Sequence, residues 1–86
     1  MLTVYSKGAC PQCSKAKQVL DYYNIEYKEV KIDEDSEARE FVVSNGHKSV
    51  PQLYVNKTLL VENGYVGLAA MDKDDVLKKI EELNES

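Results

Sequence analysis

The chain has 86 residues, 43% hydrophobic and 30% charged, and carries a formal net charge of −4. This length and composition predict one small globular domain over residues 1–86, and no apolar run approaches the roughly 20 residues that cross a membrane. The acidic balance and scattered basic residues argue against a nucleic-acid partner, which needs clustered Lys and Arg. Because no signal segment opens the chain, we expect a cytoplasmic protein, and we expect a monomer.

The first two elements predict a strand followed by a helix. Residues 2–5 are rich in β-forming side chains, which is typical of a short buried strand. Apolar residues then recur at helical spacing from residue 11 to about 24: Ala16, Val19, Leu20 and Tyr23. Pro11 suits the first turn of this helix, where its missing N–H has no cost. Cys10 is therefore expected at the helix N-terminus.

The rest of the chain predicts a second strand, a second helix, a β-hairpin and a third helix. These are expected at residues 27–32, from Asp35 or Ser36 to Asn45, at residues 50–55 and 58–62, and from Asp72 onward. A β-α-β crossover is right-handed and places the first two strands parallel. The order βαβαββα predicts an α/β protein with a thioredoxin-like fold, in which three helices cover a four-stranded mixed sheet.

Both cysteines lie between the first strand and the first helix, in the segment Cys10-Pro11-Gln12-Cys13. This placement indicates a thioredoxin-like redox site. A helix N-terminus stabilises negative charge, so it favours the thiolate of Cys10. Cys13 lies one turn further along and is better shielded. We expect Cys10 to be the nucleophile, and Cys13 to be the thiol that displaces the partner from a mixed disulfide.

Two other uses of the cysteines are less favoured. A zinc site needs roughly four ligands, whereas the chain has two cysteines and one histidine, His47. A purely structural disulfide across so short a loop would remove little entropy from the unfolded chain.

Three segments, in this order and spacing, resemble the glutaredoxin family: residues 7–13, residues 46–51 and residues 63–65. The resemblance covers essentially the whole chain. It implies a thiol–disulfide oxidoreductase that reduces protein disulfides and glutathione mixed disulfides. It also implies no bound cofactor, with glutathione as the reducing co-substrate.

The same resemblance implies the substrate-binding residues. In glutaredoxins the proline at the position of Pro51 is cis and faces the cysteines, so Val50 would pair its backbone with glutathione or a protein strand. Lys7 and Lys48 match positions where basic residues hold glutathione carboxylates. The other substrate-binding residues that it implies are Gln12, Ser49, Gly64, Tyr65 and Val66.

The chain departs from the glutaredoxin pattern at two places. Gln12 stands where an aromatic residue is usual, and Val66 and Gly67 stand where an acidic residue grips the γ-glutamyl ammonium of glutathione. We therefore expect weak glutathione binding, which Gly67→Asp would improve in part.

Both departures resemble glutaredoxin-like redoxins, which take electrons from thioredoxin reductase and supply ribonucleotide reductase. Such a redoxin is the second hypothesis. A third is a protein that holds an iron–sulfur cluster through Cys10 and glutathione across a dimer, although Pro11 argues against it.

Overall fold

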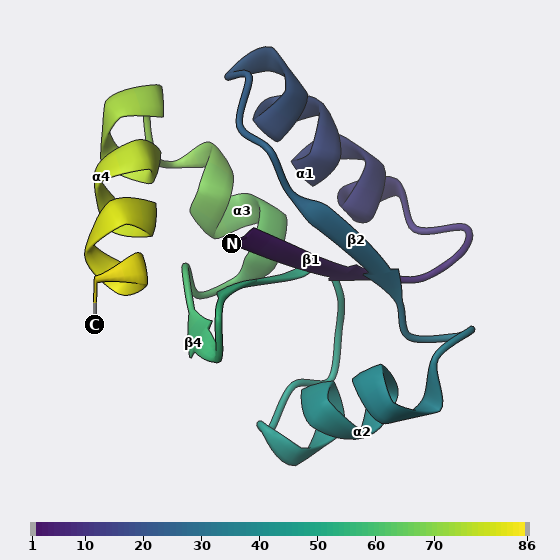
Figure 1. Cartoon of the computed structure of the whole chain (residues 1–86). Coiled ribbons are helices and arrows are strands. Elements are labelled where there is room, and N and C mark those ends of the chain that lie inside the picture. The colour runs from purple at the N-terminus through teal and green to yellow at the C-terminus, as the bar shows by residue number, and fades with distance from the viewer. Residues whose placement is uncertain (1, 86) are drawn as a thin grey trace.

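The computed structural model describes residues 2–85, which form a four-stranded mixed sheet with helices on both faces (Figure 1). The strands are β1 (Leu2–Ser6), β2 (Lys28–Lys31), β3 (Gln52–Val55) and β4 (Thr58–Leu59). Their order across the sheet is β2-β1-β3-β4. β1 runs parallel to β2 and antiparallel to β3, and β3 runs antiparallel to β4. The expected mixed sheet is confirmed.

The helices are α1 (Pro11–Tyr22), α2 (Ser36–Ser44), α3 (Gly64–Ala69) and α4 (Lys73–Asn84). The predicted starts of three of them are confirmed by their N-cap residues. The Asp35 and Asp72 carboxylates accept hydrogen bonds from backbone N–H groups in the first turns of α2 and α4, and the Cys10 sulfur does so for α1. None of the helices within residues 2–85 is long and apolar enough to cross a membrane.

The expectation of three helices is wrong, because residues 2–85 contain the additional short helix α3. Two glycines among its six residues give α3 a low intrinsic helix propensity, so the sequence does not signal it. Packing supports it instead, since Leu68 is fully buried in the main core. β4 is also shorter than expected and ends at Leu59, although the Leu60 N–H still donates to the Leu53 carbonyl of β3 at 2.8 Å.

The main core lies between one face of the sheet and helices α1, α3 and α4. Its fully buried members include Leu2, Val4, Leu20, Leu53, Leu68 and Val76. Ser6 continues the alternation of Leu2 and Val4 along β1, so its side chain faces α1. The opposite face carries Tyr5 and Tyr54, whose rings pack against Phe41 of α2 at centroid distances of 5.3 Å and 5.1 Å. Helix α2 thus covers the second face.

Two glycines of α3 allow close backbone contacts. Gly64 has a φ of +54°, and a Cβ there would overlap the backbone carbonyl of Pro51. Gly67 leaves no room for a side chain either, because a Cβ would overlap the carbonyl of Glu62. The start of α3 consequently lies directly against the segment that leads into β3, which brings it next to the cysteine loop.

Candidate active site

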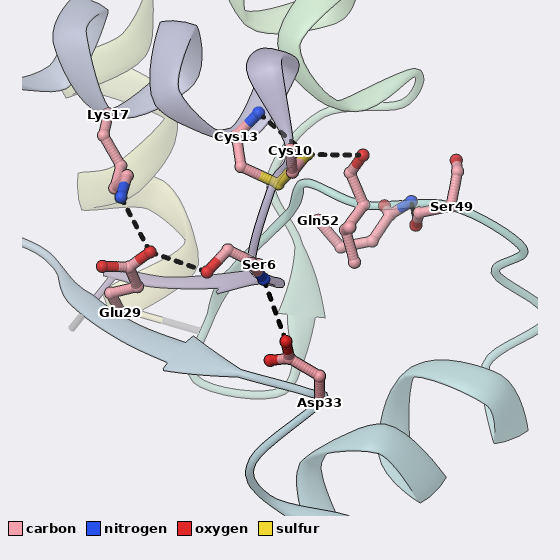
Figure 2. The surroundings of a disulfide bond; sticks show 10 residues. Ser6, Cys10, Cys13, Lys17, Glu29, Asp33, Ser49 and Gln52 are labelled. Carbon is pink, nitrogen blue, oxygen red and sulfur yellow. Dashed lines mark hydrogen bonds and ion pairs between the residues drawn. A yellow bond between two sulfur atoms is a disulfide. The ribbon is translucent and has the colours of Figure 1, made fainter.

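Cys10 and Cys13 form a disulfide at the N-terminus of α1, with their Cα atoms 5.2 Å apart (Figure 2). The Cys13 N–H donates a hydrogen bond to the Cys10 sulfur at 3.1 Å. Cys10 is half-buried, whereas Cys13 is only 2% exposed. The predicted position of Cys10 at the helix entrance and the predicted shielding of Cys13 are confirmed.

The segment before β3 lies across the disulfide. The Val50–Pro51 peptide bond is cis, as predicted. The Val50 carbonyl oxygen lies 3.8 Å from the Cys10 sulfur, so the backbone of Val50 runs alongside the more accessible cysteine. Gln52 is buried and donates from its side-chain amide to the Ser49 carbonyl at 2.8 Å (Figure 2). Sequence reasoning missed this role of Gln52, although a polar residue opening an apolar strand is a visible signal.

His47 anchors the same segment to the sheet. Its Nε2 and the Tyr54 hydroxyl are hydrogen-bonded at 2.6 Å, and the two rings pack edge to face. The contact lies on the aromatic face covered by α2, and it fixes the chain just before Lys48 and Ser49. His47 therefore supports the segment that leads to Val50 and Pro51.

A groove beside Val50 gathers three basic side chains, Lys7, Arg39 and Lys48. Its other lining residues are Ile32, Val42, Val43, His47 and Ser49. The structure thus brings together Lys7 and Lys48, which lie 41 positions apart in the sequence. Arg39 was missed, although its position between the buried Ala38 and Val42 on α2 could have placed it at the edge of that helix's buried face.

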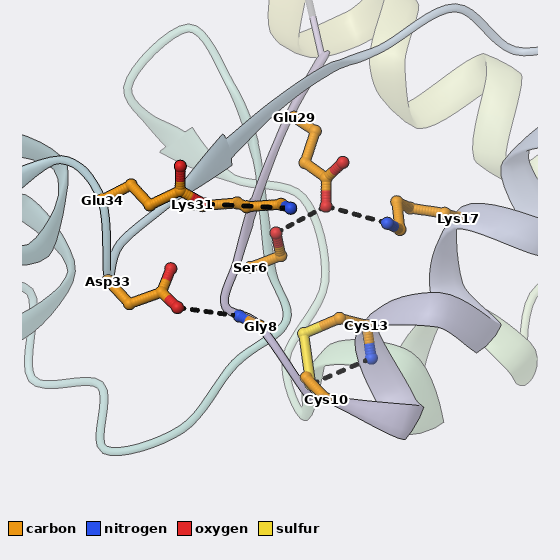
Figure 3. A network of polar contacts seen from close by, with 9 residues as sticks. All are labelled: Ser6, Gly8, Cys10, Cys13, Lys17, Glu29, Lys31, Asp33 and Glu34. Carbon is orange, nitrogen blue, oxygen red and sulfur yellow. Dashed lines mark hydrogen bonds and ion pairs between the residues drawn. A yellow bond between two sulfur atoms is a disulfide. The ribbon is translucent and has the colours of Figure 1, made fainter.

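A second groove opens on the other side of the disulfide and is lined by Cys10, Cys13, Lys17, Glu29 and Lys31, among others. Within it, the Glu29 carboxylate accepts a hydrogen bond from the buried Ser6 hydroxyl at 2.7 Å and pairs with the Lys17 ammonium at 2.9 Å (Figure 3). These two contacts hold the pKa of Glu29 below its ordinary value of 4.5. We call Ser6, Glu29 and Lys17 the polar triad.

Sequence reasoning missed the whole triad. Its three residues come from β1, α1 and β2, and only the strand pairing places Glu29 beside Val4 and so near Ser6. A neighbouring contact fixes the cysteine loop itself, since the Gly8 N–H donates to the Asp33 carboxylate at 3.0 Å (Figure 3).

The remaining residues implied by the resemblance lie around the cysteines without forming one cluster. Gln12 is exposed on the first turn of α1, and Gly64 lies against Pro51. Tyr65 is half-buried, with the Lys15 ammonium 5.9 Å from its ring centroid. Val66 is 59% exposed on α3. Because Gly67 has no space for a side chain, the suggestion that Gly67→Asp would restore an acidic anchor is wrong.

Comparison with known proteins gives the family. The glutaredoxin family model matches residues 2–60. Glutaredoxin 1 of Rickettsia conorii is 32% identical over 82 residues, which cover 92% of this chain and 78% of that protein. This chain belongs to the glutaredoxin family.

The chain is also similar in sequence to a glutaredoxin-like protein and in structure to a glutaredoxin bound to glutathione. The glutaredoxin-like protein NrdH of Lactococcus lactis subsp. cremoris is 41% identical over 51 residues, which cover 59% of this chain and 71% of that protein. The crystal structure of a buckwheat glutaredoxin–glutathione complex shares the fold with a TM-score of 0.75 at 20% identity, over 96% of this chain and 78% of that one. The chain is therefore a thiol–disulfide oxidoreductase with a thioredoxin-like fold.

The lowered pKa of Glu29 predicts how the stability of this glutaredoxin depends on pH. A carboxyl whose pKa is lower in the folded state adds stability above its unfolded pKa and loses it as the pH falls through the folded value. Urea unfolding of the oxidised protein should show Glu29→Gln to be less stable by roughly 1 kcal/mol at pH 7, because a charged acceptor is lost. The difference should shrink below about pH 4.

Glu26→Gln is the matched control, since Glu26 is exposed two residues before β2. It should leave the free energy of unfolding nearly unchanged at both pH values. An equal loss for Glu29→Gln at about pH 3 and pH 7 would show that the carboxylate charge contributes nothing to folding.

Proposed function

We propose that the protein is a dithiol glutaredoxin that uses glutathione to reduce protein disulfides and glutathione mixed disulfides. The observation that carries this proposal is the asymmetry of the cysteine pair. The half-buried Cys10 sulfur lies at a helix N-terminus beside the Val50 backbone, while Cys13 lies behind it at 2% exposure. A substrate sulfur can therefore approach Cys10 directly.

The reaction proceeds in two sulfur exchanges. The Cys10 thiolate attacks a substrate disulfide, so a Cys10–substrate bond forms and the other substrate sulfur leaves as a thiolate. Cys13 then attacks the Cys10 sulfur, which forms the Cys10–Cys13 disulfide and releases the second substrate thiol. Two glutathione thiols reduce this disulfide again and leave as glutathione disulfide. The helix N-terminus stabilises the Cys10 thiolate at the start of each cycle.

The groove beside Val50 supports the choice of glutathione. Val50 offers backbone pairing to an extended tripeptide, and Lys7 and Lys48 line a groove in which Arg39 adds a third cation for a carboxylate. Ser49 lies in the same groove. On the far side of Pro51, the start of α3 would receive the γ-glutamyl end. The residues proposed there are Gly64, Tyr65 and Val66, with Gln12 facing the substrate from α1.

The use of glutathione as the reductant indicates the compartment and the partners of the protein. A glutathione-dependent enzyme needs a reducing compartment, so we propose a cytoplasmic monomer without a bound cofactor. Its partners would be glutathione and disulfide-bearing proteins, with ribonucleotide reductase as a candidate substrate.

A second candidate function is that of a redoxin reduced by thioredoxin reductase. Two observations favour it: residues 66 and 67 offer no carboxylate to the γ-glutamyl ammonium, and a stretch of the chain is 41% identical to a protein named NrdH. The iron–sulfur hypothesis has no comparable support. Among residues 2–85, no three His, Cys, Asp or Glu side chains gather into a group that could hold a metal ion.

The exposure of the two cysteines predicts their separate roles. In the reduced protein, iodoacetamide should alkylate Cys10 before Cys13, because Cys10 is both more accessible and nearer the helix N-terminus. Cys10→Ser should abolish all reductase activity. Cys13→Ser should keep the reduction of glutathione mixed disulfides, which needs one thiol, and lose that of protein disulfides, which needs two.

Peptide mapping of the alkylated protein and the two activity assays check these roles. Earlier alkylation of Cys13, or full disulfide reductase activity in Cys10→Ser, would reverse the assignment.

The exposed position of Val66 predicts a way to strengthen glutathione binding. Val66→Asp places a carboxylate in the first turn of α3, where the helix dipole favours it, and offers it to the γ-glutamyl ammonium. The KM for glutathione should fall about two- to fivefold, since an exposed ion pair contributes up to about 1 kcal/mol. Val66→Asn is the matched control and should gain little, because it lacks the charge.

Saturation curves for glutathione in a mixed-disulfide assay measure this effect. An equal fall of the KM for glutathione in both variants would show that the charge of the carboxylate does not strengthen binding. No turnover with glutathione in any of the proteins, together with rapid reduction by thioredoxin reductase, would favour the redoxin over the glutathione-linked enzyme.

A further inference from the structure

The polar triad lies next to the cysteine that the solvent barely reaches. Glu29 and Lys17 line the groove that also contains Cys13, and the Ser6 hydroxyl donates to Glu29. Glu29 and Lys17 lie on the opposite side of the disulfide from Ser49 (Figure 2). Lys17 follows Cys13 by four residues on α1, so their Cβ atoms lie about 5–6 Å apart on one helix face. The Lys17 and Glu29 side chains are only 28% and 27% exposed, which limits screening of their charges by solvent.

Cys13 has a chemical need that this site can meet. In the second exchange Cys13 must lose its proton before it can attack the Cys10 sulfur. At 2% exposure its thiolate would be poorly solvated, and burial disfavours the charged form of a thiol. At the N-terminus of α1 the Cys13 N–H donates its hydrogen bond to the Cys10 sulfur. Cys13 therefore requires another source of positive charge.

We propose that the Lys17 ammonium stabilises the Cys13 thiolate during the second exchange, and that Glu29 is a positioning residue that holds this ammonium in place. The buried Ser6 hydroxyl donates a hydrogen bond to the Glu29 carboxylate and so fixes its position (Figure 3). The lowered pKa of Glu29 fits the role, because the contacts with Ser6 and Lys17 that lower it also stabilise the charged carboxylate of the ion pair. This inference rests on the two-exchange reaction proposed above.

The other charged groups around Cys13 are few. Lys7 and Lys31 line the same groove from the cysteine loop and from β2. Lys31 lies 3.9 Å from the Glu34 carboxylate, and Asp33 accepts from the Gly8 N–H. Helix α3, which packs on α1, and strand β3 carry no charged side chain. Of these cations, Lys17 is the one that shares a helix face with Cys13.

The second exchange involves only the two cysteines, the bound substrate and solvent protons. The Cys13 proton passes to solvent in the groove, and the resulting thiolate forms a bond to the Cys10 sulfur. The bond between Cys10 and the substrate sulfur breaks, and that sulfur leaves with the electron pair and takes up a proton. Cys10 and Cys13 are oxidised together, and the substrate disulfide is reduced to two thiols.

A dithionitrobenzoate disulfide separates the two exchanges in stopped-flow experiments, because each exchange releases one coloured thiolate. The first phase depends on reagent concentration and reports the attack by Cys10. The second phase is intramolecular, so it is independent of concentration and reports the attack by Cys13. Loss of the first phase in the natural protein would contradict the proposed function, whereas the inference about Lys17 concerns only the second phase.

Lys17→Gln should raise the pH midpoint of the second phase by about one unit and slow it roughly tenfold below that midpoint, since one pKa unit changes the thiolate fraction tenfold. The first phase should be unchanged. Lys17→Arg should restore the natural midpoint, because it keeps the charge. Lys28→Gln is the matched control, since Lys28 precedes Glu29 on β2 and points to the other face of the sheet. It should leave both phases unchanged.

Glu29→Gln should raise the midpoint less than Lys17→Gln, because the ammonium remains but is no longer held. The inference is overturned if Lys17→Gln leaves the midpoint of the second phase unchanged, or if Lys17→Arg fails to restore it. A midpoint below the natural value in Glu29→Gln would show that Glu29 opposes the thiolate, and would overturn its positioning role.

Discussion

The N-terminus of α1 meets the Val50 backbone at the Cys10 sulfur, and the rest of the site is arranged around this meeting point. The sulfur accepts a hydrogen bond from the Cys13 N–H and lies 3.8 Å from the Val50 carbonyl oxygen. The cysteine loop follows β1 directly, and β3 begins directly after Pro51. Because β1 and β3 are paired in the centre of the sheet, the distance between the cysteines and the Val50 backbone is fixed by the sheet itself.

The two sides of the disulfide have different chemistry. On the Val50 side, Lys7, Arg39 and Lys48 form a cationic groove open to solvent, which suits the carboxylates of a small anionic thiol or of a peptide segment. On the Cys13 side, the polar triad is partly shielded and internally paired, which suits a charge that arises only during the reaction. In the proposed reaction, substrate recognition and thiol release are thereby separated in space, so we expect that each can be altered by substitution without direct change to the other.

Local signals in the sequence predicted the parts of this site that depend on local structure. These signals each act within a few residues. The sequence correctly predicted Cys10 at the start of α1, Pro11 in its first turn and Asp72 at the start of α4. The cis Val50–Pro51 bond was predicted from resemblance rather than from local chemistry.

Features that depend on contacts between distant segments were missed. Helix α3 forms in spite of Gly64 and Gly67, because its glycines permit close contact with Pro51 and Glu62. The polar triad joins three elements, and nothing in the sequence near Ser6, Lys17 or Glu29 reveals that they meet. Arg39 likewise reaches the cationic groove only through the placement of α2 against the sheet.

In the proposed reaction, the exchange with glutathione takes place at the Cys10 sulfur. It is tested most directly by adding glutathione to the oxidised protein, quenching with acid, and locating the glutathione adduct by fragmentation mass spectrometry of the peptide that contains both cysteines. We expect an adduct on Cys10, with Cys13 released as the free thiol, because Cys10 is half-buried beside the Val50 backbone whereas Cys13 is only 2% exposed. An adduct on Cys13 would contradict it.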